Sequence, residues 1–257
     1  MNKKILIVIP ARLASTRLPN KPLADIAGKP MIARVYERAI ASRVGDVLIA
    51  CDGEEIANIA RDIGANFVIT DPKLPSGTDR IYNAYRVFVE KNNLQNQYQA
   101  IINLQGDLPI IESESIISVA ELILNNDCDI ATIASRINNY EEVINPNIVK
   151  IAIANLENNI GEALYFSRAP IPYQESKIIT AGDYFHHIGV YGYKIQALEN
   201  FIKLSPSKLE KKESLEQLRA LENKMSIMVK IVDNHPFSVD TEQDLLRVRA
   251  IYIATKQ

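Results

Sequence analysis

The first residues that could do chemistry lie in one loop after an apolar run. Leu6–Ile9 is typical of a buried strand, and Pro10 is expected to end it because proline has no N–H for a central ladder. The cations and hydroxyls of the loop that follows are Arg12, Ser15, Thr16, Arg17 and Lys21. Cations pair with phosphate oxygens and hydroxyls donate to them. The loop is therefore a candidate polyphosphate site at the carboxyl end of a first strand, and the alternative is a solvated surface loop.

A second candidate is a carboxylate at the end of a later apolar strand. Ala100–Asp107 is read as a buried strand that ends in an acid, and Gly106 lets the backbone turn sharply and approach a ligand. Asp107 would then project from the same sheet edge as the first loop. Mg²⁺ takes one or two carboxylates plus substrate phosphates, so Asp107 is a candidate metal ligand. The alternative is a turn aspartate that binds its own backbone.

The first loop also carries a family resemblance. Ala11–Leu23, read as A-R-L-A-S-T-R-L-P-N-K-P-L, resembles the signature loop of the sugar-nucleotide cytidylyltransferases, and among them the enzymes acting on 3-deoxy-octulosonic acids. At least five further motifs match in the family's order. The resemblance implies transfer of CMP from CTP to the anomeric hydroxyl of 3-deoxy-D-manno-octulosonate (KDO), giving CMP-KDO and pyrophosphate for lipopolysaccharide biosynthesis. It assigns Arg12, Ser15, Arg17 and Lys21 to the nucleotide, with Lys21 also catalytic.

A second nucleotide motif precedes a predicted helix. Pro75–Arg80 matches the family's P-S-G-T-[DE]-R, and the resemblance assigns Ser76 and Arg80 to the nucleotide. Taken without the family, the same residues are a loop with Thr78 or Asp79 as the helix N-cap.

The strand end at Asp107 matches the family's Q-G-D-E-P with one departure. The resemblance assigns Gln105 to both nucleotide and sugar and makes Asp107 a catalytic ligand of Mg²⁺. Leu108 replaces the family's acid, which leaves the exact acidic sugar open.

A second metal carboxylate is implied near the end of the chain. Val239–Arg249 matches the family's V-D-T-x-x-D-L-x-R-V-R, in which the first aspartate, here Asp240, is catalytic and binds the metal. Thr241 and Asp244 resemble a capping box, so Asp240 could instead be only the approach to a helix.

The sugar-binding residues that the resemblance implies come from several motifs. Besides Gln105, they are Arg168, His187, Tyr191, Glu216 and Gln217. Arg168 would hold the sugar carboxylate by a two-pronged bond, and a surface salt bridge is its alternative. For His187 the alternative is a core or interface histidine, and for the stretch 209–223 it is a single packing helix. Lys150, inside an apolar strand, is taken as structural.

The order of predicted elements indicates an α/β protein. Apolar runs at 6–9, 47–51 and 67–70 alternate with helical periodicity, which favours a mostly parallel sheet with right-handed crossovers. The resemblance makes this a Rossmann-like nucleotidyltransferase sheet flanked by helices, in one domain spanning 1–257. A smaller α+β lobe at about 155–225 would cover the sugar and form a homodimer contact.

Composition narrows the function classes. With 257 residues, 47% apolar content and a net charge of -2, the chain can bury a full core but gives no case for nucleic-acid binding. Cys51 and Cys128 are expected in the core. No apolar run has membrane-spanning length, so we expect a cytoplasmic protein without membrane insertion.

Two rival functions remain open at this point. One is the same reaction on another acidic sugar, such as a nonulosonate, because of Leu108. The other is a non-catalytic nucleotide-binding regulator, which the retention of Lys21, Asp107 and Asp240 disfavours.

Overall fold

The computed structural model describes residues 4–14, 17–175, 183–233 and 237–254. The chain forms two compact units, one of residues 1–117 and 236–257 and the other of residues 118–235. The second unit includes more of the chain than the lobe expected at about 155–225, and the single domain spanning 1–257 stays a prediction. Among the described residues, no helix is long and apolar enough to cross a membrane.

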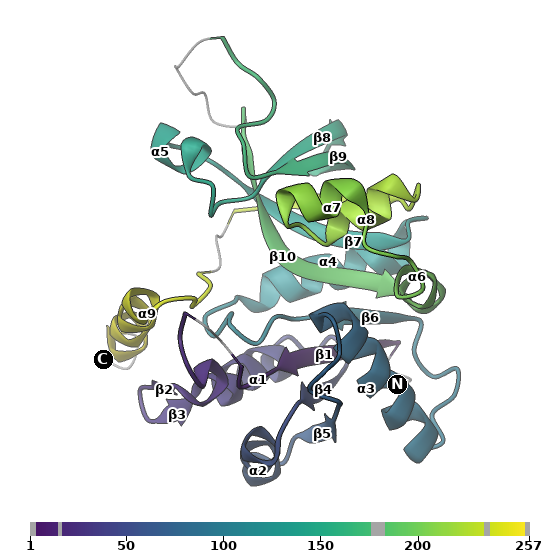
Figure 1. Ribbon diagram of the computed structural model, residues 1–257, viewed down its shortest axis with the longest axis vertical. Coiled ribbons are helices and arrows are strands. Elements are labelled where there is room, and N and C mark those ends of the chain that lie inside the picture. Colours follow the sequence, from purple (N-terminus) through teal and green to yellow (C-terminus); the bar gives the residue numbers. More distant parts are fainter. Residues whose placement is uncertain (1–3, 15–16, 176–182, 234–236, 255–257) are drawn as a thin grey trace. The chain divides into compact units, whose positions relative to one another are not determined.

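The first unit contains a sheet of four strands in the order β5-β4-β1-β6 (Figure 1). Their bounds are Ile5–Ala11 for β1, Asp46–Cys51 for β4, Asn66–Ile69 for β5 and Ala100–Asn103 for β6. All three pairings are parallel. Apolar, largely β-branched side chains are typical of strands covered on both faces, and Ile5–Ile9 are all buried.

Two strand ends differ from the prediction. Pro10 does not end β1, since it still pairs with Ala50 of β4. The pairing with β6 stops at Val8 and Asn103. At Pro10 there is therefore no β6 residue opposite, and the missing N–H breaks no hydrogen bond on that side. In the same way β6 ends four residues before Asp107, and the acid lies in the turn that follows.

The helices of the first unit are α1 (Met31–Ala41), α2 (Glu54–Asp62), α3 (Gly77–Lys91) and α9 (Glu242–Ala254). The first three pack against strands of this sheet, whereas α9 packs against the short strand at Asp25–Ile26. A 3-10 helix at Lys21–Leu23 and the short strands β2 (Asp25–Ile26) and β3 (Lys29–Pro30) complete the unit, and α4 (Ser113–Asn125) continues into the second unit. One apolar cluster contains Leu18 of the first loop, Val239 beside Asp240, and Tyr252 of α9. Apolar burial therefore fixes both loops that carry the charged residues.

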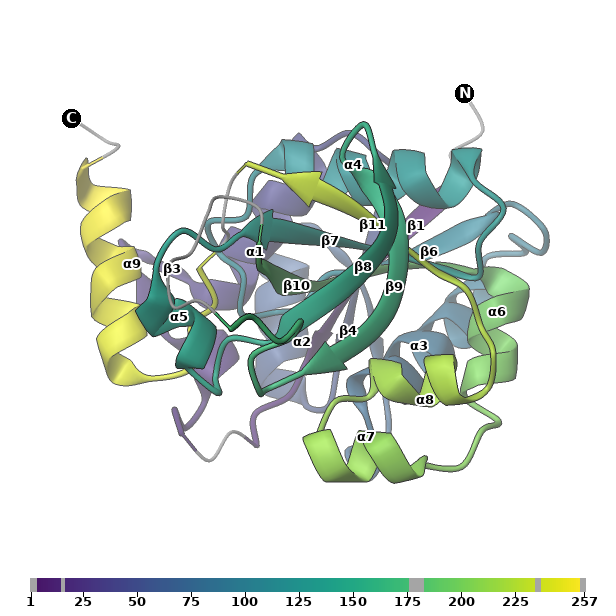
Figure 2. The same cartoon turned by 90° about the horizontal axis from the view of Figure 1, so that it is seen from above.

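The second unit has five strands in the order β10-β7-β11-β9-β8. Their bounds are Ile130–Arg136 for β7, Lys150–Glu157 for β8, Ile160–Ser167 for β9, Phe185–Lys194 for β10 and Ile227–Val232 for β11. Only the pairing of β11 with β7 is parallel, and those of β10 with β7, β11 with β9 and β8 with β9 are antiparallel. A mostly parallel sheet therefore does not describe this unit, because β8 and β9 form a tight hairpin (Figure 2) rather than being joined by a helical crossover.

The helices of the second unit are short. They are α5 (Tyr140–Ile144), α6 (Ile195–Phe201), α7 (Lys208–Glu213) and α8 (Gln217–Glu222). The prediction of a single helix over 209–223 is wrong, because Ser214, between α7 and α8, adopts a left-handed conformation with φ of 56°. A left-handed residue ends an α-helix, so the leucine stripe is carried by two helices.

Candidate active site

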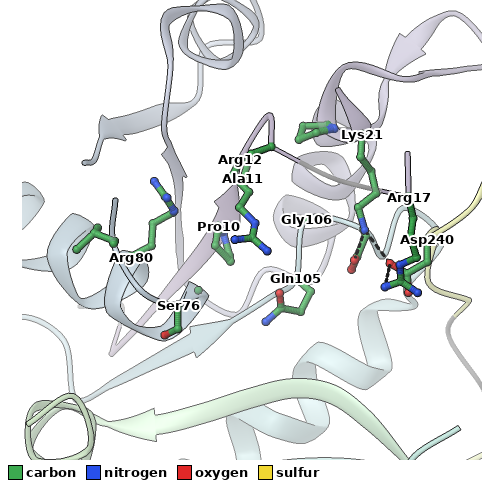
Figure 3. Close-up of a pocket in the computed structure, with 15 residues that line it drawn as sticks. Pro10, Ala11, Arg12, Arg17, Lys21, Ser76, Arg80, Gln105, Gly106 and Asp240 are labelled. Carbon is green, nitrogen blue, oxygen red and sulfur yellow. Dashed lines mark hydrogen bonds and ion pairs between the residues drawn. The ribbon is translucent and has the colours of Figure 1, made fainter. Parts of the chain in front are cut away.

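A pocket of about 470 Å³ lies in the first unit, at the carboxyl ends of β1 and β6 (Figure 3). Its charged lining residues are Arg12, Arg17, Lys21, Arg80, Asp107 and Asp240. Four cations and two carboxylates thus share one cavity. This composition suits a polyanion together with a cation that is bound between carboxylates.

Lys21 is the centre of the charged cluster. Its Nζ donates to Asp107 Oδ2 at 2.7 Å and to Asp240 Oδ1 at 3.0 Å (Figure 3). Burial alone lowers the pKa of Lys21, but the charges and hydrogen bonds of the two carboxylates outweigh it and raise the pKa above its ordinary value. Lys21 is therefore a stable cation throughout the neutral pH range.

Backbone contacts explain how two acids so distant in sequence meet. The N–H of Val239 donates to the carbonyl of Asp107 at 2.9 Å, which joins the turn after β6 to the segment before α9. At the start of α9, Asp244 accepts from the backbone N–H groups of Asp240 and Thr241 at 3.2 and 2.9 Å. The capping box predicted from Thr241 and Asp244 is confirmed by the reciprocal bond from Asp244 N–H to Thr241 Oγ1 at 3.2 Å.

Gly106 is needed because the turn after β6 touches β1. A Cβ at this position would lie 2.7 Å from the carbonyl oxygen of Pro10. Any larger residue would push the turn away, so Gly106 allows the turn to approach β1 closely. The predicted close approach to a ligand stays a prediction.

The arginines of the pocket have different partners. Arg12 and Arg17 are both exposed on the loop after β1. Arg17 Nη2 lies 3.1 Å from Asp240 Oδ1. Arg80 is buried and donates to the hydroxyl of Thr70. Burial lowers the pKa of Arg80, which Asp52 opposes, and arginine remains charged in either case.

One helix N-cap near the pocket differs from the prediction. Ser76, rather than Thr78 or Asp79, is the N-cap of α3, because its hydroxyl accepts from the N–H groups of both residues at 3.1 and 3.2 Å. Asp52 lies just before Gly53, which is the N-cap of α2. The Asp52 carboxylate accepts from Leu13 N–H at 3.2 Å, which ties the cationic loop to the end of β4.

The other nucleotide candidates are placed as follows. Gln105 lines the pocket and donates from Nε2 to Asn103 Oδ1 at 3.2 Å. Ser15 lies outside the described residues. Leu108 is 4% exposed and is not part of the pocket lining, so the leucine that replaces the family's acid packs into the protein interior.

The sugar candidates other than Gln105 lie in the second unit, and three of them are neighbours. The rings of His187 and Tyr191 are 5.3 Å apart. The pKa of Tyr191 is raised well above its ordinary value by burial, with Tyr193 and the charge of Glu216 adding to the effect. Gln217 is buried at the start of α8.

His187 is neutral at physiological pH. It is 6% exposed, and its Nε2 lies 3.2 Å from Thr132 Oγ1. Burial lowers the pKa of His187 to about 3. It can therefore act as a hydrogen-bonding group but not as a cation.

Among the residues that the structure describes, no three or more His, Cys, Asp and Glu side chains form a cluster that could hold a metal ion. Cys51 and Cys128 are buried as predicted, and burial raises the pKa of each thiol to about 11. Lys150 is buried and bonded to backbone carbonyls, in agreement with a structural role.

Residues 6–227 match the family model described as Cytidylyltransferase. The chain belongs to the cytidylyltransferase family. It is therefore an enzyme of the nucleotidyltransferase type.

Relatives within the cytidylyltransferases cover almost the whole chain. A 3-deoxy-manno-octulosonate cytidylyltransferase of Parvibaculum lavamentivorans is 46% identical over 95% of this chain and 91% of its own length. The enzyme of that name from Bartonella bacilliformis is 47% identical over 98% of this chain and 99% of its own length.

Solved structures agree with this placement. A structure of CMP:2-keto-3-deoxy-manno-octonic acid synthetase complexed with CTP has a TM-score of 0.87 and 35% identity, and covers 99% of this chain and 100% of its own. A UDP-glucose pyrophosphorylase without ligand has a TM-score of 0.70 at 16% identity, covering 98% of this chain and 99% of its own, and shows only a shared fold. The comparison thus confirms the predicted α/β nucleotidyltransferase fold in its coarse form, a mixed α/β fold like that of the CMP:2-keto-3-deoxy-manno-octonic acid synthetase.

Sequence reasoning missed the part that two residues play in holding the cytidylyltransferase pocket in place. Asp52 fixes the cationic loop, and Thr70 receives the Arg80 guanidinium. Asp52 and Thr70 follow strand ends at the same sheet edge, and this was the available signal.

Proposed function

We propose that this enzyme transfers CMP from CTP to the anomeric hydroxyl of 3-deoxy-D-manno-octulosonate, releasing pyrophosphate. The observation that carries the proposal is the pocket in which Arg12, Arg17, Lys21 and Arg80 face the same cavity as Asp107 and Asp240. The names of the relatives support the sugar, and the CTP complex of the similar structure supports the nucleotide.

Arg12, Arg17 and Lys21 would bind the triphosphate. Arginine offers paired N–H groups that match phosphate oxygens, and lysine adds a compact charge. These contacts neutralise charge that would repel the attacking hydroxyl, and they align the α-phosphorus with it. Ser76, Arg80 and Gln105 complete the nucleotide side of the proposal, with Ser15 as its remaining predicted member.

Asp107 and Asp240 would hold Mg²⁺. Their oxygens converge on one cationic atom, Lys21 Nζ, at 2.7 and 3.0 Å, so the donor set fits a small hard cation with phosphate oxygens as further ligands. When bound, Mg²⁺ supplies charge neutralisation at the phosphates and can activate the sugar hydroxyl. Lys21 would then be released from the carboxylates toward the triphosphate.

Arg168, His187, Tyr191, Glu216 and Gln217 would bind the sugar together with Gln105. The guanidinium of Arg168 suits the sugar carboxylate, and neutral His187, Glu216 and Gln217 suit its hydroxyls. We further propose that the enzyme is a cytoplasmic homodimer whose product serves lipopolysaccharide biosynthesis.

The test is product formation from CTP, Mg²⁺ and KDO, followed by ³¹P spectroscopy. The proposal predicts one phosphodiester signal for CMP-KDO and an equal amount of pyrophosphate. CTP that binds but remains intact in the presence of KDO would contradict it and favour a nucleotide-binding regulator.

A further inference from the structure

Arg168 is held in the second unit by contacts to both its backbone and its side chain. Its Nε donates to the carbonyl of Glu213 at 2.9 Å, and its Nη1 donates to the carbonyl of Pro146 at 2.9 Å. A guanidinium has five N–H groups in a rigid plane. Two bonds to carbonyls on different segments fix that plane and leave the remaining N–H groups for an anion.

Glu213 binds the same arginine from the end of α7. Its carboxylate accepts from the backbone N–H of Arg168 at 3.0 Å, from Ser167 Oγ at 2.7 Å and from Tyr165 OH at 3.4 Å. The backbone carbonyl of Glu213 receives Arg168 Nε, so this one residue fixes the position of Arg168 twice. The left-handed Ser214 ends α7 immediately afterwards, which sets where the carbonyl points.

Lys150 fixes the opposite side of Arg168. It is fully buried on β8, and its Nζ donates to the carbonyls of Arg168 at 2.6 Å, Ile148 at 2.6 Å and Asn145 at 2.9 Å. The three ammonium protons therefore have three acceptors. Because residues 145–148 also include the Pro146 carbonyl that receives Nη1, Lys150 fixes both the backbone of Arg168 and one support of its guanidinium.

This arrangement has a feature that simple stabilisation does not require. Among the described residues no carboxylate lies within ion-pair distance of Lys150 Nζ, although Glu213 is near enough to affect its pKa. The carboxylate and the ammonium are kept apart, and each binds the segment of Arg168 instead. A charge that is fixed by carbonyls cannot swing to a new partner, which is the property needed to preorganise a binding group.

We propose that Lys150 and Glu213 are positioning residues that set the Arg168 guanidinium for the carboxylate of the acidic sugar. The inference rests on the proposed function, in which Arg168 binds that carboxylate. Neither residue touches the substrate in this account. Their effect on the reaction passes through Arg168 alone.

The first test is Glu213→Gln, with KM for KDO and KM for CTP measured separately. The amide keeps the size of the side chain but removes the charge and replaces one acceptor by a donor. We expect KM for KDO to rise about tenfold while KM for CTP changes less than twofold. The matched control is Asp129→Asn, whose carboxylate accepts from Ser226 N–H and Oγ at 2.8 and 3.0 Å in the same unit without contact to Arg168. It should leave both KM values unchanged.

A double-mutant cycle separates positioning from general stabilisation. In an Arg168→Ala background, Glu213→Gln should raise KM for KDO no further, because the group that it positions is gone. If the Lys150→Met variant folds, it should also raise KM for KDO only when Arg168 is present. If it does not fold, the Glu213→Gln result alone decides whether the positioning role holds.

The outcomes are distinguishable from failure of the proposed function. If the wild-type enzyme does not use KDO, the proposed function fails and this inference fails with it. If the wild type uses KDO but Glu213→Gln leaves its KM unchanged, or raises it equally with and without Arg168, the positioning role is overturned and the proposed function stands.

Discussion

Two lysines, one in each unit, use the same ammonium group in opposite surroundings. Lys21 lies in the pocket of the first unit between two carboxylates, and those charges raise its pKa. Lys150 lies in the interior of the second unit and binds three backbone carbonyls. Burial lowers the pKa of Lys150, the Arg168 charge lowers it further, and Glu213 opposes both.

The difference separates a group that can exchange partners from one that cannot. Carboxylates bind an incoming cation as readily as they bind Lys21, so the lysine can leave them for a phosphate. Backbone carbonyls belong to the fold, and leaving them would deprive three partly buried carbonyls of their donor. We therefore expect substitutions around Lys21 to change catalysis and substitutions of Lys150 to change folding stability.

Asp107→Asn should have the largest effect on catalysis. Loss of one preorganised electrostatic contact typically costs 10²–10³-fold, so we expect kcat to fall on the order of 10²-fold or more with the protein still folded. Pyrophosphate release at saturating Mg²⁺ measures the rate, and thermal unfolding is the control. Turnover near that of the wild type would remove Asp107 from the site.

Lys21→Met should lower kcat on the order of 10²-fold, because the charge that would bind the triphosphate is lost. Its stability cost should stay near ~1 kcal/mol, since the Asp107 and Asp240 side chains are 26% and 34% exposed and solvent screens the pair. Denaturant unfolding and steady-state kinetics on the same preparation measure both. A large loss of stability with unchanged kcat would contradict the account, because Lys21 would then contribute to folding rather than to catalysis.

Lys150→Met should lower the free energy of unfolding by up to about 3 kcal/mol. The substitution leaves three partly buried carbonyls without their donor, at ~1 kcal/mol for each. Urea denaturation measures the change, and CTP affinity of the folded fraction is the control that should stay constant. A variant as stable as the wild type would mean that other donors can replace the ammonium.

Arg12→Ala should raise KM for CTP at least about tenfold, with a smaller effect on kcat. A charge-assisted hydrogen bond contributes ~1.5–3 kcal/mol, and ~1.4 kcal/mol is a factor of ten. Lys29→Ala is the matched control, because Lys29 is an exposed cation outside the pocket lining. Equal KM values in the two variants would show that Arg12 does not contact the nucleotide.

His187 should make the second unit sensitive to acid. Its pKa in the folded protein is about 3, below its ordinary value of 6.5. The unfolded chain therefore binds an extra proton between these values, and stability falls as the pH drops through this window by up to ~1.4 kcal/mol per pH unit. Unfolding free energies of wild type and His187→Asn at several pH values measure this, and parallel curves would contradict it.

Much of the first unit follows from local sequence rules. Continuous apolar runs separated by helical periodicity give parallel strands with crossovers, and the charged loop after β1 then falls at the sheet edge by construction. The meeting of Asp107 with Asp240 could not be derived in this way. It depends on the bond from Val239 N–H to the Asp107 carbonyl and on the apolar cluster around Tyr252, which are long-range contacts without a local pattern.

The second unit was harder to predict because single backbone conformations decide its form. Leucines at helical spacing favoured one helix, but the left-handed Ser214 divides it. The β8–β9 hairpin is antiparallel, which agrees with the α+β lobe expected at about 155–225, but no local pattern specified its pairing with β11. Family resemblance named Arg168, His187 and Glu216, yet only the structure reveals the contacts of Lys150 and Glu213 with Arg168.

The most direct test of the central claim is pyrophosphate release from CTP and Mg²⁺, with KDO and a sialic-acid-type sugar assayed side by side. We expect release with KDO and none above background with the other sugar. That result would also mean that Leu108, buried outside the pocket lining, is a tolerated variation. Release with only the second sugar, or with neither, would contradict the proposed reaction.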